Sequence, residues 1–527
     1  MANLKKTDAI ASYTNLFITI LTALVLVPII ESNVGKNYYG IYQFVFSLTI
    51  YVELISLGLG KTVERYVAKY AEEKRKNMEG ATVSMALTIY MFTSLLFFIG
   101  VGLLNWQFGN IFIFRGTELE IARLSFLVAA LNAGLNVPAS LFWFHLKGRG
   151  RFSFIFNIRT AQAISRVPVF ILLLNAGHGI VTLFLVDMIL VQSVNLIYAL
   201  VSIFKYRLSI RLFYFEKTLF KKLFQFTFFM LLGGIAQLLY WNADNIILAI
   251  FTDAEIIAEY ALSQRLLDYF FRYSVAFSGL FIPLFMQCYV GKDQDQSRAL
   301  LANLFTQSSR ILGILVSFVV VNFIVLGRDF VVLWIGDHFP MTYVYTVIIL
   351  IPYWLILSQS TGTEMVYVMN KHKIISYIYL GCALVNIAAT VYLVQQIGAI
   401  GAAMATGITL FLGYFLLANL YYRNLLNMKL GQYYKEVYLK NALVSGFILI
   451  YGFLLNQIIT QISAVHFIGK GLLLNFVFIP LIYIVLLKSN ERKEILHKLS
   501  DYKGTIRGMI NDRIEEYKRA LGSEKGK

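Results

Sequence analysis

Residues 12–70 predict the fold: SYTNLFITILTALVLVPIIESNVGKNYYGIYQFVFSLTIYVELISLGLGKTVERYVAKY. The stretch contains two apolar blocks of about 20 residues, the length with which a helix spans a bilayer. A short turn with one lysine, Lys36, separates the blocks, and a run of basic residues follows the second block. Because Lys and Arg are retained on the cytoplasmic side, the turn is expected outside and the basic run inside. We therefore predict two membrane-spanning helices with the N-terminus inside.

The composition extends this interpretation to the whole chain. Of the 527 residues, 58% are hydrophobic and only 14% are charged, whereas a soluble protein carries about 25% charged residues. The net charge of +17 is explained by retention of basic residues on the cytoplasmic side, so nucleic acid is not expected as a partner. The two cysteines, Cys288 and Cys382, imply neither a disulfide framework nor a metal motif.

The apolar blocks predict an all-α polytopic membrane protein with about 14 transmembrane helices and both termini in the cytoplasm. Alternating strand patterns, as in a transmembrane barrel, are absent from the sequence. The predicted spans are 12–31, 38–58, 82–105, 120–145, 154–174, 179–203, 223–250, 256–288, 303–326, 342–366, 374–394, 400–421, 441–460 and 471–487.

The distribution of basic residues supports this number of spans. The inner segments hold 36 of the 46 Lys and Arg residues. The outer loops hold only Lys36, Arg115, Arg328 and Lys470. The other six are all arginines inside predicted spans, where an arginine that faces lipid costs about 2.5–3.5 kcal/mol on the insertion scale. Some of them must therefore reach the interface or face a polar interior: Arg123, Arg159, Arg166, Arg265, Arg272 and Arg310.

Two halves of the chain resemble each other at an offset of about six spans. YYGIYQF (38–44) corresponds to IIAEYAL (256–262), and 146–180 corresponds to 367–400. An even number of spans gives both halves the same orientation, so we expect two six-helix lobes related by a pseudo-twofold axis along the membrane normal. The predicted parts are lobes at 1–204 and 223–424, a basic cytoplasmic linker at 205–222, helices 13 and 14 at 425–489, and an amphipathic tail at 490–527.

The stretch SQRLLDYFFRY (263–273) places Arg265, Asp268 and Arg272 on one face of a predicted span. Their depth along the helix brackets the membrane midplane. Because intramembrane ionisable residues are usually functional, we favour a cationic site for an anionic substrate, in which Asp268 orients the arginines. The alternative is a salt-bridged cluster that packs one lobe against the other.

Further candidate residues lie in other spans. Arg159 and Arg166 are seven residues apart and share a helix face, and either could join the anion site. The acids Glu53, Asp244, Glu364 and Asp268 could neutralise arginines or carry a coupled Na⁺ or H⁺. Asp187 and Asp244 lie nearer to the ends of their spans, which favours pairing or polar packing for these two.

Several activities are disfavoured by missing motifs. GKT at 60–62 follows Ile55 where a P-loop requires glycine, and HExxH and Cys/His clusters are absent from the sequence. The predicted outer loops are short, whereas membrane glycosyltransferases usually display a larger one. We therefore expect no enzyme and no cofactor apart from a coupling ion.

The chain resembles the polysaccharide-biosynthesis oligosaccharide flippases (Wzx type) of the multidrug/oligosaccharidyl-lipid/polysaccharide exporter superfamily. The resemblance rests on 12–70, on KKLFQFTFFMLLGGIAQLLYWNADNIILAIFTDAEIIAEYALSQRLLDYF (221–270) and on QQIGAIGAAMATGI (395–408). It implies two lobes around a cavity that opens alternately to each side, lined largely by spans 1, 2, 7 and 8. It also implies a cargo of oligosaccharide on polyprenyl diphosphate, moved to the outer leaflet of the cytoplasmic membrane.

The resemblance also implies roles for particular residues and segments. Arginines suit a diphosphate because they bind phosphate oxygens in a bidentate manner. Helices 13 and 14 are candidates for a lipid-tail groove, and other polysaccharide-assembly membrane proteins are candidate partners. The alternatives are an ion-coupled multidrug/cation antiporter, a teichoic-acid or peptidoglycan-precursor flippase, a membrane-embedded transferase and a non-transporting scaffold. The surplus of arginine disfavours the antiporter, which would need a net-negative cavity.

Overall fold

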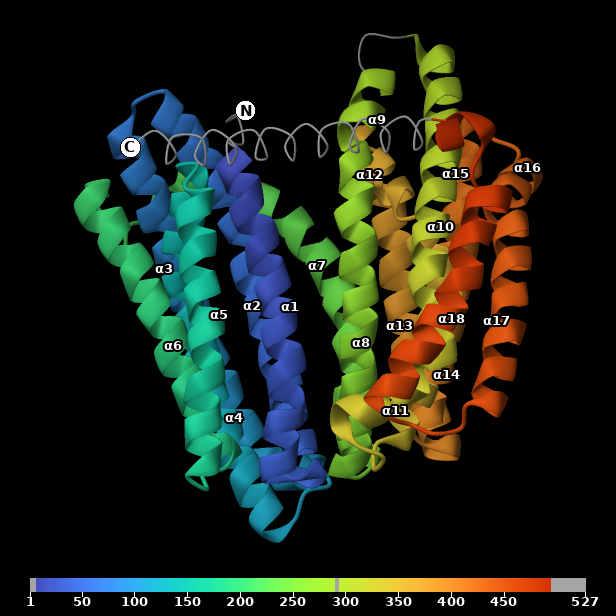
Figure 1. The fold of residues 1–527 in the computed structure, drawn as a ribbon. Coiled ribbons are helices and arrows are strands. Elements are labelled where there is room, and N and C mark those ends of the chain that lie inside the picture. Colours follow the sequence, from blue (N-terminus) through green and yellow to red (C-terminus); the bar gives the residue numbers. More distant parts are fainter. Residues whose placement is uncertain (1–5, 290–292, 494–527) are drawn as a thin grey trace, which may run out of the picture.

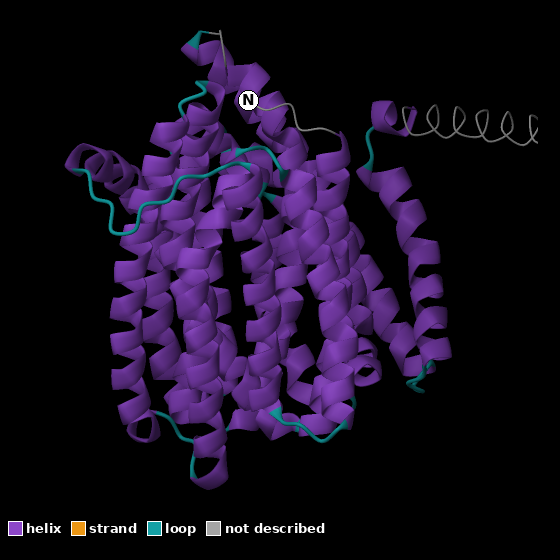
Figure 2. Cartoon of the chain, turned by 90° about the vertical axis from the view of Figure 1, so that its left-hand side faces the viewer, coloured by secondary structure: helices purple, strands orange, loops and turns teal. Residues whose placement is uncertain are grey.

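The computed structural model describes residues 6–289 and 293–493, and every regular element in these ranges is a helix. Helices run side by side along one direction, and the connecting loops lie at their two ends (Figures 1 and 2). The first six helices are α1 (Lys6–Val34), α2 (Lys36–Glu72), α3 (Lys76–Ile111), α4 (Gly116–Gly148), α5 (Phe152–Asn175) and α6 (Ile180–Leu200), the last of which continues as a π-helical turn (Val201–Lys205).

A second set of helices follows the connecting segment 206–216. These are α7 (Lys217–Phe251), α8 (Ala254–Ser278), α9 (Ile282–Tyr289), α10 (Gln294–Ile335), α11 (Pro340–Ser358), α12 (Thr361–Val368), α13 (His372–Ile397), α14 (Ala399–Thr409) and α15 (Ala418–Leu426). A 3₁₀ turn (Gly279–Phe281) separates α8 from α9 just before Pro283, whose ring cannot continue an α-helix without a break. The last helices are α16 (Leu430–Tyr434), α17 (Lys440–Ile458) and α18 (Ala464–Leu481), with π-helical segments at Leu410–Leu417, Lys435–Leu439 and Ile482–Leu486.

The helices form two groups that spread apart toward the end where α1 begins (Figure 1). We call α1–α6 the first group and α7–α15 the second group; α7 lies between them and packs against both α2 and α13. At the opposite end, α2 also packs against α8, and one apolar core continues from the first group into the second. The predicted domain boundaries agree with this description in outline, but they stay a prediction.

The tight connection between α1 and α2 depends on Gly35, whose φ of +84° is unfavourable for residues with a side chain. Many large apolar side chains on the outside of the bundle are exposed, among them Phe92, Trp106 and Phe476. Such a surface suits lipid rather than water. The helices therefore bury their polar side chains inward and present apolar ones to the bilayer.

Within residues 6–289 and 293–493, eleven helices are long and apolar enough to cross a membrane. Each of the fourteen predicted spans coincides with a helical segment, but α2, α5 and α7 are not among the eleven. The middle of α5 carries Arg159 and Arg166, and parts of α2 and α7 have side chains outside the described residues. The all-helical membrane fold is confirmed, whereas the number of fourteen and the inside–outside assignment stay predictions.

One segment departs from the sequence-based expectation, and another lies outside the described residues. The prediction that Lys470 lies in an outer loop is wrong: Lys470 is inside α18, buried, and donates a 2.6 Å hydrogen bond to Asp329 of α10. The charge at this position is tolerated because its partner is an equally enclosed carboxylate. The predicted amphipathic tail lies, from residue 494 on, outside the described residues.

Candidate functional site

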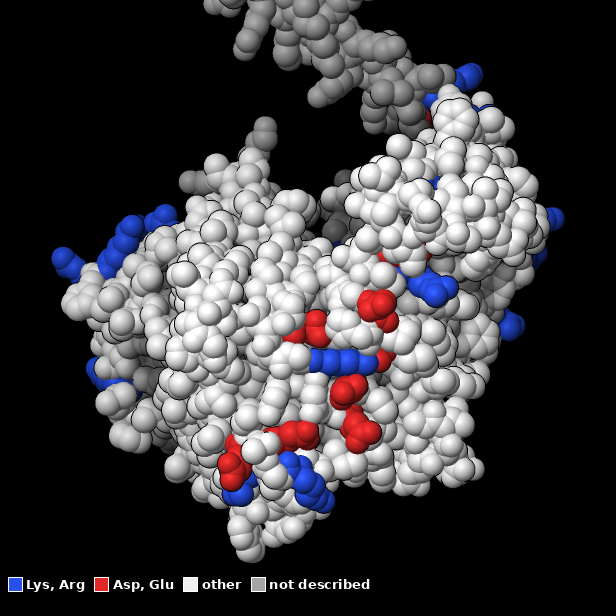
Figure 3. Space-filling model, turned by 60° about the horizontal axis from the view of Figure 1, so that its bottom comes forward, with Lys and Arg blue, Asp and Glu red and all other residues white. Residues whose placement is uncertain are grey.

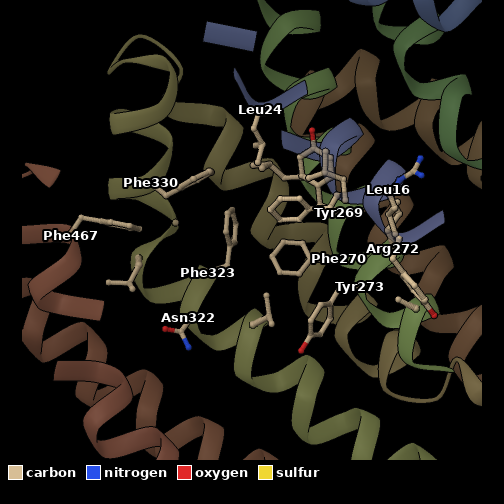
Figure 4. Close-up of a pocket in the computed structure, with 18 residues that line it drawn as sticks. Leu16, Leu24, Tyr269, Phe270, Arg272, Tyr273, Asn322, Phe323, Phe330 and Phe467 are labelled. Atoms are coloured by element: carbon tan, nitrogen blue, oxygen red, sulfur yellow. The ribbon is translucent and has the colours of Figure 1, made fainter. Parts of the chain in front are cut away.

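An apolar groove of about 760 Å³ lies between α1, α8 and α10 (Figure 4). Its walls come from one side of α1 around Leu16 and Leu24, from Phe270 of α8 and from Phe323 of α10. Phe467 of α18 also lines it, so one of the two appended helices contributes a side chain to the wall. The groove therefore joins the first group to the second and offers an apolar ligand a place at their boundary.

Among the described residues that line the groove, Arg272 alone is charged. Its Nε donates a 2.6 Å hydrogen bond to Oδ2 of Asp268, one turn earlier on α8. The two side chains are 49% and 44% exposed, so both are open to a ligand or to water. This pair places a polar, nearly neutral contact at the border of an apolar surface.

Arg265 is separated from this pair along α8 and points toward α2. Its Nη2 donates to Oε1 of Gln43 at 3.3 Å. No carboxylate of the described residues lies within ion-pair distance of Arg265. The three charges predicted as one cluster are thus divided between a paired Arg272 and an Arg265 whose positive charge is uncompensated.

Arg166 of α5 forms an ion pair with Asp187 of α6, and its Nη2 also donates to the hydroxyl of Tyr42 at 3.2 Å. Tyr42 and Gln43 are neighbours on α2, so adjacent residues of one helix contact Arg166 and Arg265. The first and second groups are therefore connected through polar contacts on α2. Asp187 has the pairing role that its position near a span end favoured.

Arg159 is exposed, and its guanidinium lies 4.4 Å from the ring centre of Trp143 on α4. Nζ of Lys147 lies 4.4 Å from the same ring. Two cations on one indole are stabilised by its negative face but keep their positive charge. The first group therefore carries a cationic, aromatic region around Trp143. No carboxylate of the described residues forms an ion pair with Arg159 in this region.

Asp244 of α7 is fully buried and has only polar, uncharged partners. Its carboxylate accepts hydrogen bonds from the Tyr260 hydroxyl at 2.6 Å, from Thr406 at 2.8 Å and from Thr390 at 3.2 Å. Nearby, Asn386 donates to Thr406, but its own Oδ1 is enclosed without a partner. A buried carboxylate without a basic partner is costly unless a proton or a metal cation balances it.

The remaining predicted acids contribute less. The side chain of Glu53 on α2 lies outside the described residues. Glu364 of α12 is half-buried, and among the described residues it has no hydrogen-bond or ion-pair partner. The structure brings neither of them to the groove lining.

Ion pairs join the two groups at the end opposite the gap, and we call this set the outer latch: Glu31, Lys36, Glu259 and His338. Lys36 donates to Glu259 at 2.6 Å and to the carbonyl of His338 at 2.8 Å, and the ring of His338 lies 2.8 Å from Glu31. Figure 3 shows acidic and basic side chains side by side on this face, surrounded by uncharged surface. The two groups are held closed here.

Several of these contacts have no signal in the sequence. Gln43, Trp143, Thr390 and Thr406 are ordinary residues in apolar helices, and only the fold brings them to Arg265, Arg159 and Asp244. The contact between Asp187 and Arg166 could have been predicted, because the two residues lie at similar distances from the outer ends of adjacent spans. The position of Glu31 and Lys36 beside a short turn could have marked these two as candidates for contacts at that end.

Two helix groups, a groove at their boundary and charged side chains inside the bundle make up the candidate site. The structure of the lipid II flippase MurJ in an inward closed conformation has the same fold, with a TM-score of 0.67, 14% identity, and coverage of 91% of this chain and 99% of that one. An inward-facing multidrug resistance MATE family transporter of the MOP superfamily matches with a TM-score of 0.66 and 12% sequence identity. The match covers 79% of this chain and 99% of that one. An outward-facing conformation of such a transporter matches with a TM-score of 0.52 and 12% sequence identity. The match covers 81% of this chain and 98% of that one.

The profile of the family described as "Polysaccharide biosynthesis protein" matches residues 7–288. The chain belongs to this family. No curated protein sequence matches the chain. Of the solved structures with this fold, the first is named a lipid II flippase and the second a multidrug resistance transporter.

Proposed function

We propose that the protein moves lipid-linked oligosaccharides, carried on polyprenyl diphosphate, from the inner to the outer leaflet of the cytoplasmic membrane. The observation that supports this most directly is the apolar groove with Arg272 and Asp268 on its border and Arg265 close by on α8. An amphipathic cargo with a long apolar tail and an anionic head matches this arrangement. The family description and the similarity to MurJ, which is named a lipid II flippase, support the same proposal.

The apolar groove suits the polyprenyl tail, because contact with its aromatic and aliphatic walls needs no polar partner. The uncompensated charge of Arg265 suits a phosphate oxygen, and Arg272 could exchange its contact with Asp268 for a second one. Asp268 would then limit the net charge of the site, which allows release as well as binding.

The outer latch suits a cycle of alternating access that begins from the inner leaflet. The higher similarity to the inward-facing MATE structure than to the outward-facing one supports the same starting state. Cargo would bind while the latch is closed. Opening of the latch would then expose the head group to the other side.

We further propose that Asp244 couples transport to a cation gradient. The carboxylate, the hydroxyls of Thr390 and Thr406, and the orphaned Oδ1 of Asn386 are hard oxygen donors of the kind that suit Na⁺, and a proton on Asp244 would balance the same charge. Binding at this site would link the packing of α7, α8, α13 and α14.

A multidrug/cation antiporter shares the fold, but an uncompensated Arg265 and Arg159 disfavour a cationic cargo. A teichoic-acid or peptidoglycan precursor would present similar phosphate chemistry. Other polysaccharide-assembly membrane proteins are the expected partners. Comparison of cargoes in one assay separates these cases.

The test uses cells that need this protein for surface polysaccharide. Replacing Arg265 and Arg272 together with Ala should make lipid-linked repeat units accumulate on the inner leaflet while the protein still inserts. The control is Arg328→Ala, which removes an exposed arginine outside the groove lining. Normal surface polysaccharide with the double variant would reject the proposed role of these arginines.

A further inference from the structure

A row of polar side chains runs along α4, α5 and α6 of the first group, apart from the apolar groove. We call it the polar strip: Asn132, Asn136, Trp143, Arg159, Arg166, Asp187, Gln192 and Asn195. Along α4 it extends from Asn132 to Trp143, about 17 Å at the rise of an α-helix. Each of the three helices supplies at least two of its members.

Four amides form the middle of the polar strip. Gln192 donates to Oδ1 of Asn132 at 2.9 Å, and Asn195 donates to Oδ1 of Asn136 at 2.8 Å and to Gln192 at 3.3 Å. Asn132 and Asn136 are half-buried, and neither Nδ2 donates a hydrogen bond to a described residue. Packing of α4 on α6 therefore uses the oxygens of these two amides and leaves their donors available.

The strip does not face lipid. On α5, Arg159 and Arg166 lie on the face opposite the exposed apolar residues Ile164 and Leu172. Arg159 reaches Trp143 of α4, and Arg166 reaches Asp187 of α6, so this polar face points into the first group. Arg159 is nevertheless exposed, which means that water or a polar ligand has access to this interior.

A carbohydrate fits these properties. Sugars present closely spaced hydroxyls, each of which donates and accepts, and planar amides supply both functions side by side. The charged groups at the two ends of the strip would add stronger, charge-assisted hydrogen bonds. We propose that the polar strip binds the hydroxyl groups of the cargo's oligosaccharide, an inference that rests on the proposed function and assigns the glycan to the first group.

The experiment measures binding of two probes to the purified full-length protein in detergent. One probe is polyprenyl diphosphate, and the other is the same lipid with its oligosaccharide, isolated from producing cells. The variant Asn132→Ala/Asn136→Ala should bind the glycosylated lipid about tenfold more weakly and the bare lipid with unchanged affinity. The control is Asn456→Ala, which removes an amide contact between α17 and α10 and should affect neither probe.

The outcomes separate the two proposals. Equal affinity of wild type and double variant for the glycosylated lipid, or an equal loss for both lipids, would overturn the glycan site and leave the flippase function standing. Failure of the wild type to bind either lipid would overturn both. If Asn136→Ala disturbs folding because Asn195 loses its acceptor, the single variant Asn132→Ala decides between these outcomes. In that variant Gln192 can still donate its hydrogen bond to the backbone carbonyl of residue 132, at 3.3 Å.

Discussion

At the scale of single residues, the arginines inside the bundle differ in their partners rather than in their depth. Arg272 and Arg166 each have a carboxylate, whereas Arg265 contacts an amide and Arg159 an indole. A paired arginine contributes little net charge, while an unpaired one attracts an anion over a longer distance. We therefore expect Arg265 and Arg159 to dominate attraction of the cargo, and Arg166 to dominate structure.

Arg166→Ala should be destabilising because it leaves Asp187 enclosed without its partner, at a cost of about 3 kcal/mol. The double variant Arg166→Ala/Asp187→Ala should recover much of this loss, since neither charge is then left alone. Thermal unfolding midpoints in detergent measure both. The control pair is Arg298–Asp295, an exposed contact at 3.7 Å whose removal should change stability by less than about 1 kcal/mol. Equal destabilisation by the single and double variants would contradict the pairing.

Asp244→Asn should abolish the dependence of transport on the coupling cation gradient, because the amide cannot carry the negative charge that a proton or Na⁺ balances. Transport rates with and without a Na⁺ or proton gradient in vesicles provide the measurement. The matched control is Asp253→Asn, an exposed acid at the start of α8. A gradient dependence unchanged from wild type would rule out Asp244 as the coupling residue.

The candidate residues could be found from the sequence, but their contacts could not. The spacing of Arg265, Asp268 and Arg272 places all three on one helix face, yet side-chain length and the neighbouring helix decide that Asp268 pairs with Arg272 and Arg265 with Gln43. Composition also cannot show that two of the three hydroxyls around the carboxylate of Asp244 come from residues more than 140 positions away.

At the scale of helices, the closed end depends on close contact between α2 and α8. A Cβ at Gly40 would overlap the carbonyl oxygen of Ala254, so only glycine permits this approach. Gly40→Ala should separate the two helices and favour an open latch. Spin labels at Asn33 and Asp337, both exposed on this face, should then show a longer distance than in wild type.

The control for this change is Gly100→Ala on α3, where a Cβ would meet open space. Lys36→Ala provides a second route to the same result, because it removes the contacts to Glu259 and His338 without adding volume. Distance distributions identical to wild type in both Gly40→Ala and Lys36→Ala would contradict the latch.

The segment that follows α18 and its π-helical turn (Ile482–Leu486) is fixed to α10 by an ion pair between Arg310 and Glu491. Burial alone would raise the pKa of Glu491, but the Arg310 guanidinium and the backbone N–H of Lys488 hold it below its ordinary value. A carboxyl whose pKa is lowered on folding stabilises the folded state at any pH above its unfolded pKa of about 4. This stabilisation is lost as the pH falls through the pKa of the folded protein. At neutral pH, the free energy of unfolding of the wild-type protein should therefore be higher than that of Glu491→Gln by about 1 kcal/mol.

This difference should stay constant from pH 8 to 5, begin to fall near the unfolded value of about 4, and vanish once the pH is below the lowered pKa of folded Glu491, where the glutamate is protonated and resembles glutamine. Thermal unfolding of both proteins across this range measures it. A difference that grows on acidification would contradict the assigned sign. Together with the Lys470–Asp329 pair, the contact makes α18 a fixed wall of the groove rather than a loose appendage.

Helix positions follow closely from apolar block length, because a bilayer span imposes about 20 residues. The ends of the helices do not follow from the length of the apolar blocks. The helix α10 continues to Ile335, and α18 begins at Ala464, so that Lys470 lies inside α18. A charge count treats every lysine as a loop residue, and it cannot detect one whose carboxylate partner comes from another helix. Burial as an ion pair is a property of the assembled bundle.

At the scale of the whole molecule, the two helix groups are joined at one end and spread at the other (Figure 1). Besides the latch, the indole N–H of Trp334 donates to the carbonyl of Leu24 at 2.8 Å, which ties α10 to α1. Closure at one end with the groove between the groups is the arrangement required for loading from one leaflet. The asymmetry of state could not be predicted from the sequence, and the duplication of the chain stays a prediction.

Transfer of lipid-linked oligosaccharide across a vesicle membrane tests the central claim most directly. The protein is reconstituted in liposomes with a labelled glycan on polyprenyl diphosphate, and the fraction of label that an external glycan-modifying reagent reaches is followed over time. Wild-type protein should make the inner-leaflet pool accessible, and Arg265→Ala/Arg272→Ala should not. Transfer no faster than in protein-free vesicles, or equal transfer by the double variant, would contradict the account.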